Sequence, residues 1–199
     1  MNDDFTVEEC LFEVASGQLG HFTTAQAARC GMSRNLITHH VRSGRFRRER
    51  RAIYRLRDYP PSMHEEIMVG WLAVGRDIAV VSHQSALAIH DLSDVIADAI
   101  HVTVPRVQRT RARVTGVRVH TSTRSFEPLD IVRREGMRVT SPIRTVLDID
   151  ELGLSLEHVE RAAREVIDRG QATRSMFLER ALTYGGRFRN HLVHGQVQL

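Results

Sequence analysis

The chain has 199 residues, 42% of them hydrophobic, and a formal net charge of +4 with a pI near 9.8. This length fits one large or two small domains with an ample core, and the charge figures indicate regional rather than global basicity. The acidic N-terminus MNDDFTVEEC has no apolar signal core, and no apolar run approaches the roughly 20 residues that span a bilayer. These features exclude a secreted or membrane-spanning protein, so we expect a cytoplasmic protein.

Three helices are predicted near the start of the chain. Each begins at a threonine or serine that can cap a helix, and the ranges are 6–17, 23–29 and 33–44. Gly31 supplies the turn between the second and the third helix. A helix, a glycine turn and a second helix in this order are typical of a helix-turn-helix DNA reader.

The third predicted helix has two faces. Leu36, Ile37 and Val41 form an apolar side that can dock on the domain. The opposite side is polar, as expected of a helix that enters the major groove. We predict that this face binds DNA through Arg34, Asn35, Thr38, His39 and Arg42.

A strongly basic hairpin is predicted next, with strands over 45–48 and 52–56. Between Arg29 and Arg57 the chain has ten arginines against one acid, Glu49, which is an excess of nine positive charges. Such a wing would fix register on the phosphate backbone or in the minor groove. The alternative is a charged helix and hairpin that are only solvated. The wing residues assigned to DNA are Arg47, Arg48, Arg50 and Arg51.

Prolines at 60 and 61 interrupt all periodicity and predict a linker between two domains, residues 1–60 and 62–199. The second domain should be mixed, with a small sheet flanked by helices. The predicted strands cover 78–81, 100–104, 114–120 and a hairpin at 131–140, and the predicted helices cover 62–74, 82–92, 141–149, 156–169 and 174–184. The tail after Gly186 has no clear period. The fold class is therefore α/β (α+β), with an N-terminal winged helix-turn-helix.

Several possible chemical sites have simpler interpretations. Cys10 and Cys30 lie in apolar helical patterns and are read as two buried thiols of a reducing compartment rather than a disulfide or redox pair. His83, His90 and His101 lack the spacing of a zinc motif, so no metal and no cofactor are expected. The acids Asp148, Asp150 and Glu151 follow a predicted helix and are read as surface residues, although paired carboxylates can bind magnesium.

A second basic run follows the predicted strand at 100–104, with no acid between Val102 and Ser125. It is either a solvated loop and strand face or a second surface for DNA, tRNA or an acidic patch on a partner protein. Its arginines are Arg106, Arg109, Arg111, Arg113, Arg118 and Arg124.

The run FTTAQAARCGMSRNLITHHVRSGRFRRERRAIYRL resembles the N-terminal winged helix of the AbiEi antitoxins of bacterial AbiE (type IV) toxin-antitoxin systems. The downstream segments VVSHQSALAIHDLSD, IHVTVPR and GMRVTSPIRTVLDIDELG are similar to the C-terminal domain of that family. The resemblance covers about His21 to Gly153. It implies a repressor that binds an inverted repeat in its own operon and neutralises a toxin of nucleotidyltransferase fold. The family often has glycine where this chain has Ala52, a departure that makes a tight wing turn less expected.

Two other functions stay open. Some antitoxins similar to this family have been proposed to phosphorylate their toxin, but the chain has no GxxxxGK[ST], HRD or DFG motif. An enzyme of this kind would be an atypical kinase with an unfamiliar site. The other alternative is an interaction protein that sequesters the toxin and binds little DNA.

Overall fold

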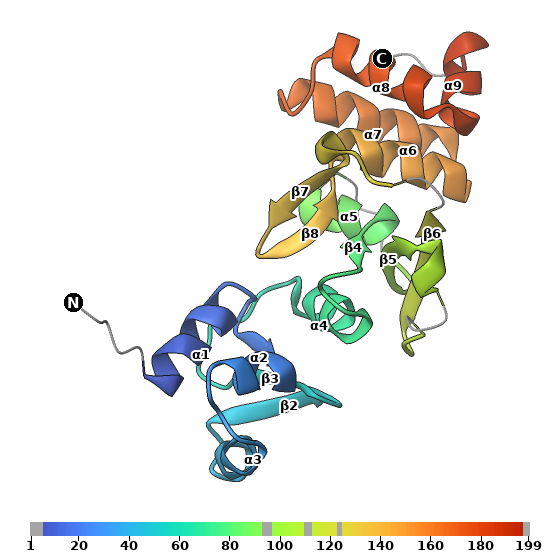
Figure 1. Cartoon of the computed structure of the whole chain (residues 1–199). Helices are drawn as coiled ribbons and strands as arrows, with labels where there is room; N and C mark the ends of the chain where they lie inside the picture. Colours follow the sequence, from blue (N-terminus) through green and yellow to red (C-terminus); the bar gives the residue numbers. More distant parts are fainter. Residues whose placement is uncertain (1–5, 93–96, 110–112, 123–124, 197–199) are drawn as a thin grey trace. The chain divides into compact units, whose positions relative to one another are not determined.

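A computed structural model describes residues 6–92, 97–109, 113–122 and 125–196 (Figure 1). Helices and strands alternate along the chain, which confirms the expected mixed α/β class. The chain forms two compact units, residues 1–78 with 135–137 and residues 79–134 with 138–199. Among the described residues, no helix has both the length and the apolar character needed to span a membrane.

The first unit is a winged helix. Its first three helices and the hairpin after them have the expected chain order. A short additional strand that was not predicted completes a three-stranded antiparallel sheet of order β1-β3-β2, and a further helix follows. The elements are α1 (Val7–Ser16), β1 (His21–Thr23), α2 (Thr24–Arg29), α3 (Arg34–Arg42), β2 (Phe46–Arg50), β3 (Ile53–Leu56) and α4 (Glu65–Val74). Its core gathers apolar side chains from both layers, with Leu11, Phe22, Ile37 and Phe46 buried.

The caps predicted for the first three helices are all present. Thr6 and Thr23 form capping boxes with Glu9 and Gln26, which satisfy backbone N–H groups at each helix start. Ser33 Oγ accepts a hydrogen bond from the backbone N–H of Leu36 at 3.2 Å. These short-range bonds explain why α2 and α3 begin where the sequence predicts.

The first unit extends beyond the predicted linker. Helix α4 packs on the three-stranded sheet, and its Glu65 accepts a hydrogen bond from the buried Arg55 of β3 at 2.7 Å. The helix begins at Glu65 rather than Ser62, which leaves Met63 exposed. The compact units therefore divide after Ile78, later than the boundary expected at residues 60–62.

The two cysteines form a disulfide, so the prediction of two separate thiols was wrong. Cys10 on α1 and Cys30 at the end of α2 have Cα atoms 5.6 Å apart and are bonded through their Sγ atoms. The packing of α1 against α2 brings them together, and no sequence spacing reports that packing.

The second unit has a five-stranded sheet of order β6-β5-β4-β8-β7 and a group of helices. Strand β4 pairs antiparallel with β5 and parallel with β8, while β5 pairs parallel with β6. The elements are β4 (Val80–Val81), α5 (His83–His90), β5 (Ile100–Pro105), β6 (Val117–Ser122), β7 (Ile131–Arg134), β8 (Met137–Thr140), α6 (Pro142–Leu152), α7 (Leu156–Asp168), α8 (Arg174–Tyr184) and α9 (Gly186–Val193). Short 3-10 turns cover Arg106–Gln108 and Pro128–Asp130. Helices α5 to α9 share one apolar core.

Helix α9 was not predicted, and its presence corrects the interpretation of the acids on α6. Asp148 and Asp150 are buried rather than on the surface, whereas Glu151 is exposed as expected. Helix α9 packs on α6 and places His191 Nδ1 3.3 Å from Asp150 Oδ1. Asp148 forms an ion pair with Arg144, which lies one helical turn earlier on α6. The expectation failed for Asp150 because its partner helix α9 comes from a segment without a clear period, and for Asp148 because Tyr184 of α8 contacts it.

Candidate nucleic-acid interface

Helix α3 docks on the first unit through Ile37, His40 and Val41. Ile37 and His40 are buried, and the His40 ring centroid lies 4.8 Å from that of Phe46. Burial lowers the pKa of His40, so the neutral imidazole serves here as part of the apolar back. Leu36 is 37% exposed, which corrects its placement on the docking side.

The predicted DNA-reading face of α3 is open to solvent. Its five members are all exposed, and within the described ranges none has a carboxylate partner. Thr38 Oγ1 donates to the backbone carbonyl of Arg34 at 2.9 Å, which leaves its lone pairs free to accept. The face consists of Arg34, Asn35, Thr38, His39 and Arg42.

The wing closes with a tight turn in spite of the missing glycine. Ala52 adopts φ +64°, a left-handed conformation that costs an L-residue roughly 1–2 kcal/mol. Its carbonyl accepts a hydrogen bond from the backbone N–H of Thr24 at 2.9 Å. A register shift between Arg48 and Arg50 accommodates the turn, so the departure at Ala52 does not prevent a compact wing.

The wing arginines divide into paired and unpaired side chains. Arg47 Nε donates to Glu49 at 2.5 Å, and its Nη2 lies 3.7 Å from Glu65. Arg48 and Arg51 are exposed, and no carboxylate in the described part of the chain pairs with them. Arg50 is half-buried.

Two other arginines of the basic stretch have structural partners. Arg45 makes a bidentate ion pair with Glu8 on α1, with both N–O distances at 3.2 Å. Arg55 is buried, and its guanidinium donates to Glu65 and to backbone carbonyls, including that of Tyr59. Counting arginines in the sequence does not separate these side chains from the exposed ones.

The second basic run lies in the second unit at the edge formed by β6. Arg118 pairs with Asp98 at 2.9 Å, and Arg109 and Arg113 line a hollow of about 420 Å³ with Val117 and Val119. Arg111 and Arg124 lie outside the described residues. The exposed members are Arg106, Arg109, Arg113 and Arg118.

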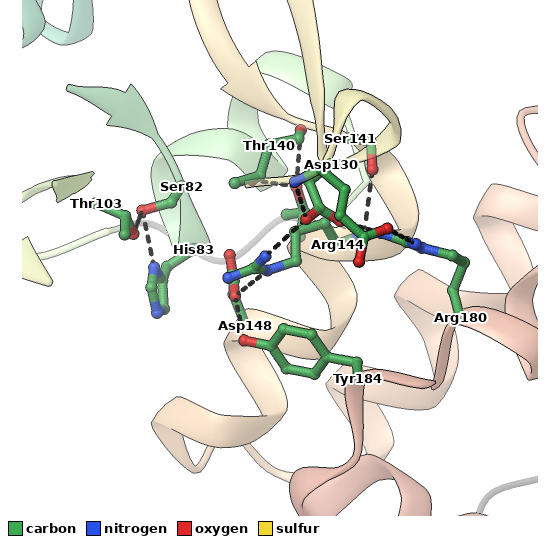
Figure 2. Close-up of polar contacts among 12 residues, drawn as sticks. Ser82, His83, Thr103, Asp130, Thr140, Ser141, Arg144, Asp148, Arg180 and Tyr184 are labelled. Atoms are coloured by element: carbon green, nitrogen blue, oxygen red, sulfur yellow. Dashed lines mark hydrogen bonds and ion pairs between the residues drawn. The ribbon is translucent and has the colours of Figure 1, made fainter. Parts of the chain in front are cut away.

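The second unit also has a cavity of about 520 Å³ with a buried ionic network on its wall (Figure 2). Arg144 donates to Asp148 at 2.8 Å and to Asp130 at 3.2 Å, and Asp130 also pairs with Arg180. The Tyr184 hydroxyl donates to Asp148 at 3.2 Å, and the Tyr184 ring centroid lies 4.5 Å from Arg144 Cζ. Sequence analysis missed this site, because only the i,i+4 spacing of the arginine and the aspartate hinted at it.

The charges around this cavity favour a cation over a phosphate. The described lining has two arginines, Arg144 and Arg180, against four carboxylates, an excess of two negative charges. Burial raises the pKa of Asp148, although Arg144 beside it opposes that shift. The four carboxylates are Glu127, Asp130, Asp148 and Glu151.

Residues 10–57 match the family model described as "Transcriptional regulator, AbiEi antitoxin". This stretch contains most of α1, both helices of the helix-turn-helix and the whole wing. The resemblance noted in the sequence is confirmed over these residues, and the match supports a DNA-binding regulator of the antitoxin type. No curated protein matches the chain.

Proposed function

We propose that the protein binds operator DNA through α3 and the wing, represses its own operon and neutralises a nucleotidyltransferase-fold toxin. One observation carries the DNA-binding part: a helix docked by an apolar back presents five exposed polar side chains, and the wing adds the exposed Arg48 and Arg51. Major-groove reading needs such a face, and backbone contacts need cations that are not already neutralised.

The proposed roles differ between α3 and the wing. Arg42 and Asn35 suit base edges, since an arginine fork matches guanine and an asparagine amide matches adenine. Arg48 and Arg51 suit phosphates, where they set register without reading sequence. Because operator DNA lies in the bacterial cytoplasm, we expect the protein there.

Arg42→Ala tests this reading directly. Fluorescence anisotropy with the duplex upstream of the gene should show that the variant loses about 1–3 kcal/mol of binding free energy. Its specificity should relax at one base pair. Arg189→Ala is the matched control, because it removes the same charge from an exposed position on α9. Equal affinities for wild type and Arg42→Ala would reject the assignment of α3 as the recognition helix.

Toxin neutralisation is proposed for the second unit. The exposed arginines 106, 109, 113 and 118 give it a cationic edge that can meet an acidic surface of the toxin. Co-expression with the neighbouring gene product should yield a stable complex that Arg109→Glu with Arg113→Glu disrupts. A toxin that becomes labelled by ATP without forming a complex would instead support the phosphorylation alternative.

A further inference from the structure

Three histidines of the second unit meet beside the cavity, although they are far apart in the sequence. His83 begins α5, His101 lies on β5 and His120 on the neighbouring strand β6. Thr103 is paired in register with His120, and residues two apart on a strand share a face. His101 and His120 therefore project from the same side of the sheet, where α5 packs on β5.

The ring nitrogens are close enough to share one ligand. His120 Nε2 lies 3.1 Å from His101 Nδ1, and one nitrogen from each of the three rings lies within 4.8 Å of the others. Tetrahedral zinc with nitrogen ligands at about 2.0–2.1 Å places those nitrogens about 3.3 Å apart. Two rings are thus near coordination distance, while His83 stacks on His120 with centroids 3.7 Å apart and must turn to join them.

The outer hydrogen bonds orient the rings as a metal site requires. His83 Nδ1 lies 2.9 Å from Ser82 Oγ, which also accepts a hydrogen bond from Thr103 at 2.8 Å (Figure 2). If His83 Nδ1–H donates to Ser82, the Nε2 lone pair is available for a metal. Metal-bound histidines usually donate their second ring N–H to such an oxygen.

His101 has a carboxylate close to its second ring nitrogen, although the two are not hydrogen-bonded. It is fully buried, its Nε2 has no hydrogen-bond partner, and the nearest carboxylate oxygen is Asp98 Oδ1 at 3.6 Å. Coordination through Nδ1 would leave Nε2–H directed at Asp98, a carboxylate–histidine–metal arrangement.

The three imidazoles are suited to a cation for electrostatic reasons as well. Burial lowers the pKa of His83 to about 2 and that of His120 to about 4, and it lowers the pKa of His101. The rings are therefore neutral at pH 7, which is the form that binds metals. His83 and His120 also line the cavity whose described wall has excess negative charge.

The geometry points to a three-histidine site for a divalent transition-metal ion, formed by His83, His101 and His120 and open to the cavity at a fourth position. Imidazole ligands suit zinc, copper and nickel, and three nitrogens with one open position match zinc best. Water would occupy the open position. No spacing motif marks this site, because each ligand comes from a different element.

The full-length protein, stripped with a chelator, should take up one equivalent of Zn²⁺ in a titration against a chromophoric chelator. Co²⁺ in its place should give the intense visible bands of a four-coordinate ion. X-ray absorption should show nitrogen and oxygen neighbours only. A sulfur neighbour at about 2.3 Å would place the metal on Cys10 or Cys30 and overturn the proposal.

Variants locate the ion. His120→Gln should weaken Zn²⁺ binding at least 100-fold, whereas His158→Gln, on the exposed part of α7, should leave it unchanged. Asp98→Asn should weaken binding roughly 10-fold through His101, as expected for an outer partner. Arg118→Gln removes the ion pair to Asp98 but keeps the carboxylate, so affinity should not fall. Binding that is absent in the wild type, or equal in wild type and His120→Gln, would refute the site.

Discussion

The wing provides a sharp test, because two adjacent arginines differ in their partners. Arg48 is exposed and unpaired within the described ranges, whereas Arg47 contacts Glu49 at 2.5 Å and Glu65 at 3.7 Å. Register places Arg47 opposite Arg55, so both face the α4 side that holds Glu65. If the proposed interface is correct, Arg48 is the one of these two side chains that is available to a phosphate.

The size of the effect follows from counterion release. Each phosphate contact contributes about 0.9 to the slope of log K against log salt concentration. A fourfold rise in salt then weakens binding by about 3.5-fold per contact. Arg48→Ala should reduce the slope by about 0.9, and Arg47→Ala should leave it nearly unchanged.

The assay is fluorescence anisotropy with operator duplex at four or more salt concentrations. Thermal melts of each variant confirm that the winged helix remains folded. Loss of Arg47 frees the charge of Glu49, which can lower affinity at every salt concentration without changing the slope. Equal slope changes in the two variants, or a larger change for Arg47→Ala, would refute the assignment of free and occupied arginines.

Three further predictions concern stability and titration. Arg144→Met should lower the free energy of unfolding by roughly 3–5 kcal/mol, since it leaves a buried carboxylate unpaired. The exposed Arg164→Ala should cost at most about 0.5 kcal/mol in the same denaturant titration. Reduction of the Cys10–Cys30 disulfide, which spans 20 residues, should cost about 3 kcal/mol in a melt with and without reductant. Burial raises the pKa of Tyr184 to about 12, above the ordinary value near 10. The free energy of unfolding should therefore fall as pH rises from about 10 to 12. Tyr184→Phe should remove the late step of the absorbance titration.

The elements that the sequence predicted correctly are those set by local patterns. Capping residues and glycine turns define α2 and α3, and the hairpin at 131–140 also appears as β7 and β8. The sequence pattern placed Leu36 on the docking side, where the structure buries His40 instead. The His40 ring became part of the core only through its contact with Phe46, a residue of the following strand.

The features that could not be predicted depend on contacts between distant segments. The disulfide requires α1 to lie against α2, and the burial of Asp150 requires α9, whose sequence has no clear helical period. The histidine cluster requires the parallel pairing of β5 with β6, which aligns Thr103 with His120. A single sequence contains no spacing that encodes such pairings.

Some arginines of this chain pair with carboxylates inside the fold, and others can contact DNA. The number in the second group sets an upper bound on the phosphate contacts of the proposed interface. Of the ten arginines between 29 and 57, Arg45, Arg47 and Arg55 are held by carboxylates and Arg50 has a contact of its own, so six remain for DNA. Six phosphate contacts would give a salt slope of about 5 per protomer as an upper bound. A steeper measured slope could not come from this stretch alone and would require the arginines at 106, 109 and 113 to contact DNA. A slope well below about 5 that Arg109→Glu leaves unchanged would instead assign the second basic run to the toxin or to solvent.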